Sequence, residues 1–433
     1  MKNLAKLSTG LIFLLTFTVV EAVSPSLLRR KIQDPQSVIT VKGKVIDAET
    51  KNPLIFASVT IQGTNVATVT NLNGEFILKI DSAFSNLSIE ILYIGYENGV
   101  MHISDLRDRG RNNTIELKQT TIPIKEVVIK AITPEEIIRQ VIVRMPENYV
   151  GVPNLMTSFY RETIKKNKKY VSIAEAVIEI FKAPYNNAFR NDMARVYKGR
   201  KNVKETKFDT VLFRLQGGPV TTLQLDLVKN PYLILTFEAM RSYDYKILKI
   251  VTIDEMPHYV IEFYQKPGID MPLFLGRMFI EMETFALSEA VFSMNLEDKN
   301  KASQIFIRKK PMGMKVSPDM ASYRVKFREQ EGKWYFAYAR AEVKLKLKWK
   351  KKLFNPSYTT MSEIAITDRT DEEVIKFNSR ERIKIGDIFT HQLSAFADPN
   401  FWGDYNVIEP DQSIESAIRR LNRKLKFSDR KGE

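Results

Sequence analysis

The residues that could do chemistry are few, because the 433-residue chain contains 3 His and no Cys. Without Cys there is no disulfide, thiolate nucleophile, zinc finger, iron–sulfur cluster or lipidated N-terminal Cys. Only His258 has a His or Glu residue, Glu262, at the spacing that zinc proteases use on a helix. The surrounding segment alternates like a strand, where positions i and i+4 lie roughly 13 Å apart, so this pair cannot clamp one ion.

Hydroxyl and carboxyl groups show no diagnostic catalytic spacing. The sequence has neither a Gly-x-Ser-x-Gly elbow nor a Gly-x-x-x-x-Gly-Lys-Ser/Thr phosphate loop. Its acidic pairs, such as Asp254–Glu255, fall at predicted turns or strand ends, which indicates solvation rather than the buried pairing that acid–base catalysis needs. We therefore predict no enzymatic activity, no catalytic or metal-binding residue and no cofactor. A hydrolase of envelope polymers remains an alternative, with either converging carboxylates or a serine paired with His258 or His391.

Positive charge is concentrated in the later part of the chain. The formal net charge is +15, and residues 131–433 carry 51 Lys and Arg against 39 Asp and Glu. A strict alternation over 334–349 predicts a long strand with Trp334, Phe336 and Tyr338 on the same face as a run of lysines. A helix predicted over about 411–427 carries arginines on its polar side. The candidate contacts with an anionic surface are Lys344, Lys346, Lys348, Lys350, Arg419 and Arg423, and a merely solvated surface is the alternative.

The first 22 residues have the pattern of a cleaved secretory signal peptide. Lys2 and Lys6 precede a 10-residue apolar stretch, residues 11–20, and Ala22 lies at a plausible cleavage point. The stretch is too short to span a membrane, for which about 20 apolar residues are needed. An uncleaved anchor is the alternative. We expect the protein in the periplasm or at the periphery of the outer membrane, where nucleic acid is an unlikely partner and peripheral membrane contact is possible.

Residues 38–118 predict a small β-sandwich, because short alternating runs are separated by turn signals. Asn73–Gly74 lies between two such runs, 67–70 and 75–80, and an Asn-Gly pair in that position predicts a hairpin.

Several motifs in this region are those of a known family. They are Gly43–Asp47, Pro53–Leu54, Ala57–Val59, Gly63–Thr64, Thr70–Phe76 and Ile94–Tyr96. In order and spacing they resemble the carboxypeptidase regulatory-like domain. The resemblance implies a transthyretin-like β-sandwich without peptidase activity, of the kind found at the N-terminus of envelope and outer-membrane proteins of the Bacteroidetes type.

Beyond a linker at 119–132, residues 133–433 predict a larger α+β domain. Thr133, Pro134 and Glu136 begin a helix over about 134–146. Four hairpins are then predicted, from the alternation and the polar turns, at 157–181, 243–265, 276–294 and 323–349. The whole chain is thus predicted to be mainly β, with an antiparallel, half-barrel-like sheet and flanking helices.

The strand segments 259–263, 276–281 and 284–287 together weakly resemble lipoprotein-carrier-type half-barrels. In that family a concave sheet holds an acyl chain. We therefore expect a non-catalytic cell-envelope protein that binds or carries an apolar or lipid ligand, or scaffolds an envelope partner. A small outer-membrane barrel is a further alternative. A large enclosed apolar cavity would support carriage, and a filled interior would count against it.

Overall fold

The computed structural model describes residues 38–108, 113–120, 132–187, 190–203, 218–306, 313–349, 355–395 and 401–419. The predicted signal peptide, most of the predicted linker, Lys350 and Arg423 lie outside these residues. The chain divides into Met1–Ser37 and a compact unit, Val38–Glu433, and the description below concerns the second.

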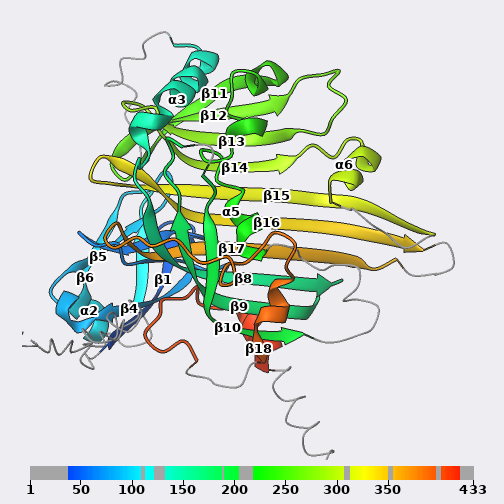
Figure 1. Ribbon diagram of the computed structural model, residues 1–433. Coiled ribbons are helices and arrows are strands. Elements are labelled where there is room, and N and C mark those ends of the chain that lie inside the picture. The colour runs from blue at the N-terminus through cyan, green and yellow to red at the C-terminus, as the bar shows by residue number, and fades with distance from the viewer. Residues whose placement is uncertain are drawn as a thin grey trace, which may run out of the picture. The chain divides into compact units, whose positions relative to one another are not determined.

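Residues 38–117 form the predicted sandwich of two small sheets (Figure 1). One sheet has the order β4-β1-β7 and the other β3-β2-β5-β6. The strands are β1 (Val38–Asp47), β2 (Ser58–Ile61), β3 (Ala67–Val69), β4 (Glu75–Asp81), β5 (Ser88–Leu92), β6 (Gly99–His102) and β7 (Asn113–Leu117). The short helices are η2 (Ser82–Phe84) and α2 (Ile103–Asp108). Their apolar side chains, including Val45, Phe76 and Ile89, meet in one buried core.

The hairpin predicted at Asn73–Gly74 is wrong. Gly74 has a φ of +76° and the pair does form a turn, but β3 and β4 belong to different sheets. The Oδ1 atom of Asn71 accepts hydrogen bonds from the backbone N of Asn73 (2.8 Å) and Glu75 (2.9 Å). Because this side chain satisfies donors that a ladder would otherwise use, the chain crosses from one sheet to the other.

The larger region is built on one open sheet of eleven strands. Its order is β11-β12-β13-β14-β15-β16-β17-β8-β9-β10-β18, and every neighbouring pair is antiparallel except β10 with β18. The strands are β8 (Asn154–Lys166), β9 (Lys169–Lys182), β10 (Met193–Val203), β11 (Tyr243–Ile253), β12 (Met256–Gln265), β13 (Phe274–Glu281), β14 (Leu287–Met294), β15 (Met314–Gln330), β16 (Lys333–Trp349), β17 (Ser357–Thr370) and β18 (Ser394–Ala395). The predicted fold class and the four predicted hairpins are confirmed.

Helices cover one side of this sheet, which we call the helix face (Figure 1). The helices are α3 (Pro134–Asn148), α5 (Gly218–Leu223), η4 (Pro231–Leu233) and η5 (Ala239–Ser242). As predicted, Thr133 caps α3, and its Oγ1 accepts a hydrogen bond from Glu136 N at 3.2 Å. Ile137 and Ile138 of α3 pack with Tyr160 of β8 in the largest buried core.

The opposite side of the sheet, which we call the ionic face, is covered by the sandwich and by a strap, residues 401–411. Trp402 and Val407 of the strap pack with Phe159 of β8. The strap also bonds to the sandwich, because Thr68 Oγ1 donates to Val407 O at 3.2 Å. Residues 412–419, which follow the strap, are helical, in agreement with the start of the predicted terminal helix; its later residues lie outside the described ranges.

Two further short helices contact or adjoin strands of the large sheet. They are α6 (Lys299–Phe306), which packs on β15, and η6 (Phe389–Gln392), which precedes β18.

The prediction that β16 keeps one alternation throughout is wrong. The register against β15 shifts, and Ala337 becomes an extra residue of β16. Such a β-bulge exchanges the two sides of a strand. Trp334 and Phe336 consequently join Ala339 in the core of the helix face, whereas Tyr338 lies on the ionic face.

Candidate functional site

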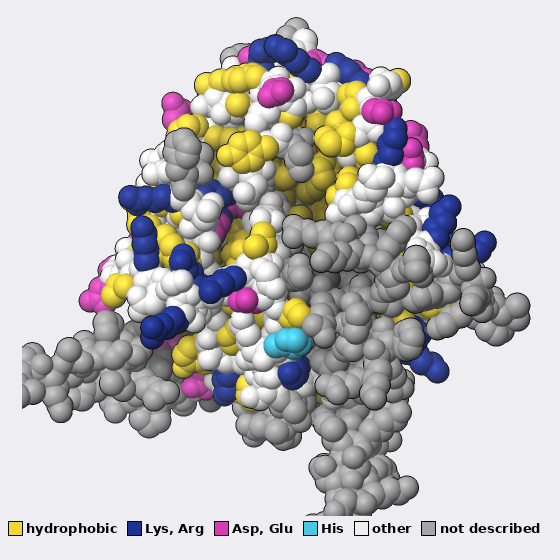
Figure 2. All heavy atoms as spheres, turned by 45° about the vertical axis from the view of Figure 1, so that its right-hand side comes forward, with side chains coloured by type: hydrophobic (Ala, Val, Ile, Leu, Met, Phe, Trp, Pro, Cys, Tyr) yellow, Lys and Arg dark blue, Asp and Glu magenta, His cyan; other side chains and the backbone are white. Residues whose placement is uncertain are grey.

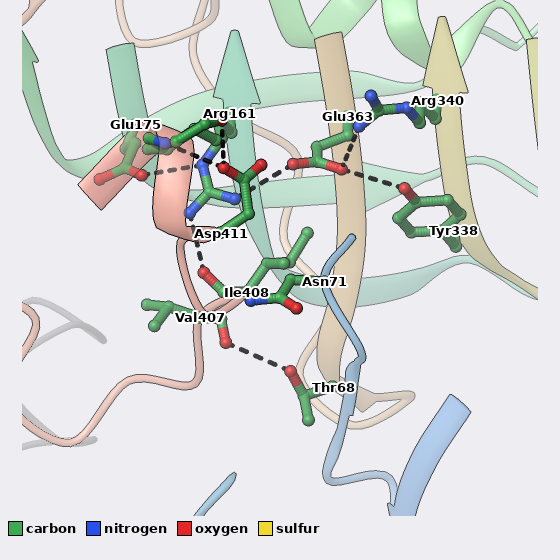
Figure 3. A network of polar contacts seen from close by, with 12 residues as sticks. Thr68, Asn71, Arg161, Glu175, Tyr338, Arg340, Glu363, Val407, Ile408 and Asp411 are labelled. Carbon is green, nitrogen blue, oxygen red and sulfur yellow. Dashed lines mark hydrogen bonds and ion pairs between the residues drawn. The ribbon is translucent and has the colours of Figure 1, made fainter. Parts of the chain in front are cut away.

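A buried charge network lies on the ionic face, where β8, β9, β16, β17 and the strap meet (Figure 3). Arg161 is 2% exposed and donates from Nε to Glu175 Oε1 at 2.8 Å. Its Nη1 donates to Glu363 Oε1 at 3.2 Å, and its Nη2 donates to Ile408 O at 2.8 Å. One guanidinium thus joins two strands of the sheet to the strap.

The two carboxylates have further donors. Arg200 Nη2 donates to Glu175 Oε2 at 2.9 Å. Glu363 Oε2 accepts from Arg340 Nη1 and from Tyr338 OH, both at 3.0 Å. Each buried carboxylate is therefore satisfied on both oxygens.

The electrostatics keep Arg161 and Glu175 ionised. Burial alone raises the pKa of Glu175, but Arg161 and Arg200 outweigh it and leave that pKa below its usual value. Burial alone lowers the pKa of Arg161, but Glu175 and Glu363 leave it raised. A carboxylate held in its charged form is a poor proton donor, so this cluster is suited to joining segments rather than to acid catalysis.

The hollow beside the network measures about 60 Å³. Phe56 and Asn71 of the sandwich, Arg340 of β16 and Asp411 of the strap are among its lining residues. It has room for a few water molecules, whereas sites for organic ligands usually measure about 300–1,000 Å³.

Glu162, the next residue along β8, lies on the helix face, and among the described residues no cation pairs with it. Its Oε2 accepts a hydrogen bond from Tyr160 OH at 2.9 Å. Close by, Thr222 Oγ1 of α5 donates to Ser362 Oγ at 3.0 Å. Burial raises the pKa of Glu162 to about 8, so its carboxyl group carries a proton at neutral pH.

The described part of the helix face is filled by its own side chains. Core residues of α3 and of the segment 223–240 pack directly onto the sheet. A second enclosed hollow, between the sandwich and the sheet, measures only about 50 Å³. These observations count against storage of an acyl chain inside this part of the molecule.

A larger hollow is open to solvent at the C-terminal end of β9. It measures about 480 Å³ and lies between β9, β10, α5 and the segment 376–384. Phe181, Met193, Val220 and Ile383 form its apolar floor. Figure 2 shows one face of the molecule, on which hydrophobic side chains gather in the upper half and Lys and Arg are spread along the margins.

The cationic residues predicted to contact an anionic surface do not form one cluster in the part of the chain that the structure describes. Lys344 and Lys346 of β16 share Asp319, with Nζ–Oδ2 distances of 3.8 and 3.0 Å, and Lys299 of α6 approaches the same carboxylate at 3.4 Å. Asp319 is the extra residue at a bulge in β15. Lys348 is exposed, and Arg419 pairs with Glu415. Contact of these side chains with an anionic surface remains a prediction.

The two histidines proposed for a hydrolase lie in different surroundings. His258 is fully buried on β12, where its Nδ1 lies 2.8 Å from Met256 O, and His391 is exposed on η6. Within the described ranges neither ring contacts a serine hydroxyl. A serine does contact His102, since Ser88 Oγ lies 3.2 Å from its Nδ1, but that pair joins β5 to β6 and has no carboxylate partner among the described residues.

Two features are absent from the described part of the chain. No group of three or more His, Asp or Glu side chains is placed to hold a metal ion. No helix is long and apolar enough to cross a membrane.

The sequence alone did not single out the charge network, Glu162 or the open hollow. The partners of Arg161 are 14, 202 and 247 positions away along the chain. The available signal was the presence of Arg161 and Glu162 in the middle of a predicted strand, because adjacent strand residues face opposite sides and a charged residue facing a core needs a partner.

Comparison with protein families identifies the sandwich. Residues 41–129 match the family model of the CarboxypepD_reg-like domain, as the motifs between Gly43 and Tyr96 predict. Comparison with curated proteins gave no match.

Comparison with solved structures gave distant similarities to the larger region. An outer membrane lipoprotein-sorting protein domain from Vibrio parahaemolyticus is 9% identical, with 56% of this chain and 95% of that chain covered and a TM-score of 0.25. A DUF1329 family protein from Desulfovibrio piger is 12% identical, with 57% and 96% covered and a TM-score of 0.24. Lipovitellin is 8% identical, with 55% and 27% covered and a TM-score of 0.24. The first of these proteins, named for lipoprotein sorting, agrees with the resemblance to lipoprotein-carrier-type half-barrels. Identities and TM-scores this low do not bear on what this chain binds.

Proposed function

We propose that this chain is a non-catalytic cell-envelope protein that binds an apolar or lipid ligand in the open hollow at the end of β9. The observation that carries the proposal is the size and floor of that hollow. At about 480 Å³ it falls within the usual range of ligand sites, and Phe181, Met193, Val220 and Ile383 offer apolar contacts. The enclosed hollows of about 50 and 60 Å³ are too small for such a ligand.

The proposed location is the periplasm or the periphery of the outer membrane. The signal-peptide pattern of residues 1–22 supports export, and the resemblance of the sandwich to modules of envelope proteins supports the same compartment.

Scaffolding of an envelope partner is a second candidate, favoured by one observation. Tyr232, Phe237 and Met271 are 68%, 50% and 56% exposed. Lys266 N donates to Ser242 O at 3.0 Å, which joins the chain that follows Phe237 to the chain that precedes Met271. Large exposed apolar side chains are typical of interaction surfaces.

Binding of a neutral fluorescent probe, Nile red, tests the first candidate. We expect saturable binding with one site per chain and displacement by octan-1-ol. Val220→Asp places a charge in the floor of the hollow and should weaken binding at least tenfold. The matched control is Val143→Asp on α3, where the native side chain is 59% exposed, and it should leave binding unchanged.

Two results would contradict apolar-ligand binding in the hollow. One is non-saturable binding, and the other is an equal response of Val220→Asp and Val143→Asp. If Tyr232→Ser with Phe237→Ser abolished binding instead, the exposed segments would be the site.

The non-catalytic part of the proposal has its own test. Purified chain incubated with peptidoglycan and with envelope polysaccharide should release no soluble fragments. Release that is lost in a His258→Ala or His391→Ala variant would establish the hydrolase.

A further inference from the structure

The open hollow has a cationic rim as well as an apolar floor. Phe181 is the penultimate residue of β9, Met193 begins β10 and Val220 lies on α5. The segment that carries Ile383 is held in place by a hydrogen bond from Ile383 N to Ala194 O at 2.8 Å. The floor is therefore part of the folded core, and Phe181 and Ile383 are only 2% and 5% exposed.

Four basic residues and one acidic residue line the rest of the hollow. The acidic residue, Asp192, is already engaged, since its Oδ2 accepts from Lys182 Nζ at 2.6 Å and its Oδ1 from Ala183 N at 2.9 Å. The basic residues are Arg190, Lys376, Arg382 and Lys384.

Within the described ranges none of these four cations pairs with a carboxylate. Arg382 Nη1 lies 3.9 Å from the sulfur of Met193, and Lys376 Nζ lies 5.9 Å from the centre of the Phe181 ring. The lysines of β16 differ, because Lys344 and Lys346 share Asp319. Like charges gathered without a counter-charge repel one another, and an anion bound among them would relieve that repulsion.

We propose that the hollow binds a single-chain amphiphile with a phosphate head, the alkyl chain lying on the floor and the phosphate among the four cations. A phosphate monoester carries about −1.5 to −2 charges near neutral pH, which suits several cations better than a single carboxylate does. Guanidinium groups bind phosphate through two parallel hydrogen bonds, and lysines add charge. This inference rests on the proposed function, since it names the head group of the ligand for the same hollow.

Calorimetric titration of the full chain with three probes tests the inference. Octyl phosphate has both the alkyl chain and the phosphate head. Octan-1-ol has the alkyl chain without the phosphate, and inorganic phosphate is the head without the chain. We expect octyl phosphate to bind at least tenfold more tightly than either of the others, and to bind more weakly as salt is raised.

Two variants separate the head from the chain. Lys376→Gln with Lys384→Gln should weaken octyl phosphate binding at least tenfold and leave octan-1-ol binding unchanged, because both side chains are exposed and not part of the floor. Val220→Asn should weaken octyl phosphate and octan-1-ol without affecting inorganic phosphate. The matched control for charge is Lys344→Gln with Lys346→Gln, which should leave all three affinities unchanged.

Each contrary outcome has a separate meaning. Equal affinity for octyl phosphate and octan-1-ol, unaffected by the rim variants, would overturn the anionic head and leave the proposed function standing. Inorganic phosphate binding as tightly as octyl phosphate would overturn the amphiphile in favour of free phosphate. Failure of both alkyl probes to bind would overturn the inference and the proposed function together.

Discussion

Arg161 and Glu162 are neighbours in the chain but lie on opposite faces of the large sheet. On the ionic face, Arg161 contacts two carboxylates and a backbone carbonyl, and Glu175 beside it has a lowered pKa. On the helix face, Glu162 has one hydroxyl donor and no cationic partner within the described ranges, and its pKa is raised to about 8. Glu175 and Glu162 are both buried, so the partners available on each face, rather than burial, determine whether a carboxyl group is charged.

The largest effect should come from breaking the ionic face. Arg161→Met leaves Glu175 and Glu363 buried with one cation fewer. We expect a loss of about 5 kcal/mol in the free energy of unfolding, at the upper end of the effect of breaking buried ion pairs. Urea unfolding measures it, with the exposed Arg419→Met as control. A loss below about 1 kcal/mol would mean that Arg200 and Arg340 suffice for the two carboxylates.

The helix face should respond to pH in the opposite sense from a paired carboxylate. The raised pKa of Glu162 stabilises the fold fully below pH 4.5, and this contribution is lost as the pH rises to about 8. Glu162→Gln should abolish the loss, which amounts to roughly 4 kcal/mol between pH 5 and pH 9 at 1.36 kcal/mol per pKa unit. The free energy of unfolding of the native protein and of Glu162→Gln, each at pH 5 and pH 9, measures this loss. An equal pH dependence in the two proteins would show that Glu162 is solvated or paired.

A smaller effect is expected where the strap covers the sandwich. Asn406 accepts from Lys79 N at 2.6 Å and donates to Lys79 O at 3.1 Å, so it completes the edge strand β4. Asn406→Ala should cost about 1–2 kcal/mol, the price of a part-buried donor without a partner. Hydrogen exchange at the Lys79 amide should accelerate, while exchange in β8 stays unchanged. Faster exchange in both would mean that the strap stabilises the whole unit.

The smallest effect is expected outside both covered faces. Lys346→Gln removes one of three lysines around Asp319, and the Lys346 side chain is 59% exposed. Exposed ion pairs contribute little, so the free energy of unfolding should change by less than about 0.5 kcal/mol. A change above 1 kcal/mol in thermal or urea unfolding would show that the bulge at Asp319 depends on this pair.

The difference between local and long-range contacts also explains which features of the fold could be predicted from the sequence. Hairpins were predicted correctly where alternation ends in a tight turn, as at Asp254–Glu255, because both residues take positive φ values and the pattern is local. The bulge at Ala337 was not foreseen, because an extra residue leaves the alternation of types intact while it exchanges the faces.

The candidate sites were harder to predict than the strands. The Asn73–Gly74 turn was recognised, but whether its flanking strands pair depends on Asn71 and on the partner sheets. The open hollow combines four separate parts of the chain, at 181, 190–193, 220 and 376–384. Such a site depends on tertiary packing and has no local pattern.

The strap also has a consequence for the order of folding. Arg161 can meet Glu175 as soon as one hairpin is made, but Ile408 follows it by 247 residues. At about 5–20 residues per second, synthesis of that interval takes roughly 10–50 s. During this time the Arg161–Glu175 pair and the apolar side chains around it face solvent without the strap. The strap, which is synthesised long after the first hairpin of the large sheet, thus completes the face that this hairpin begins.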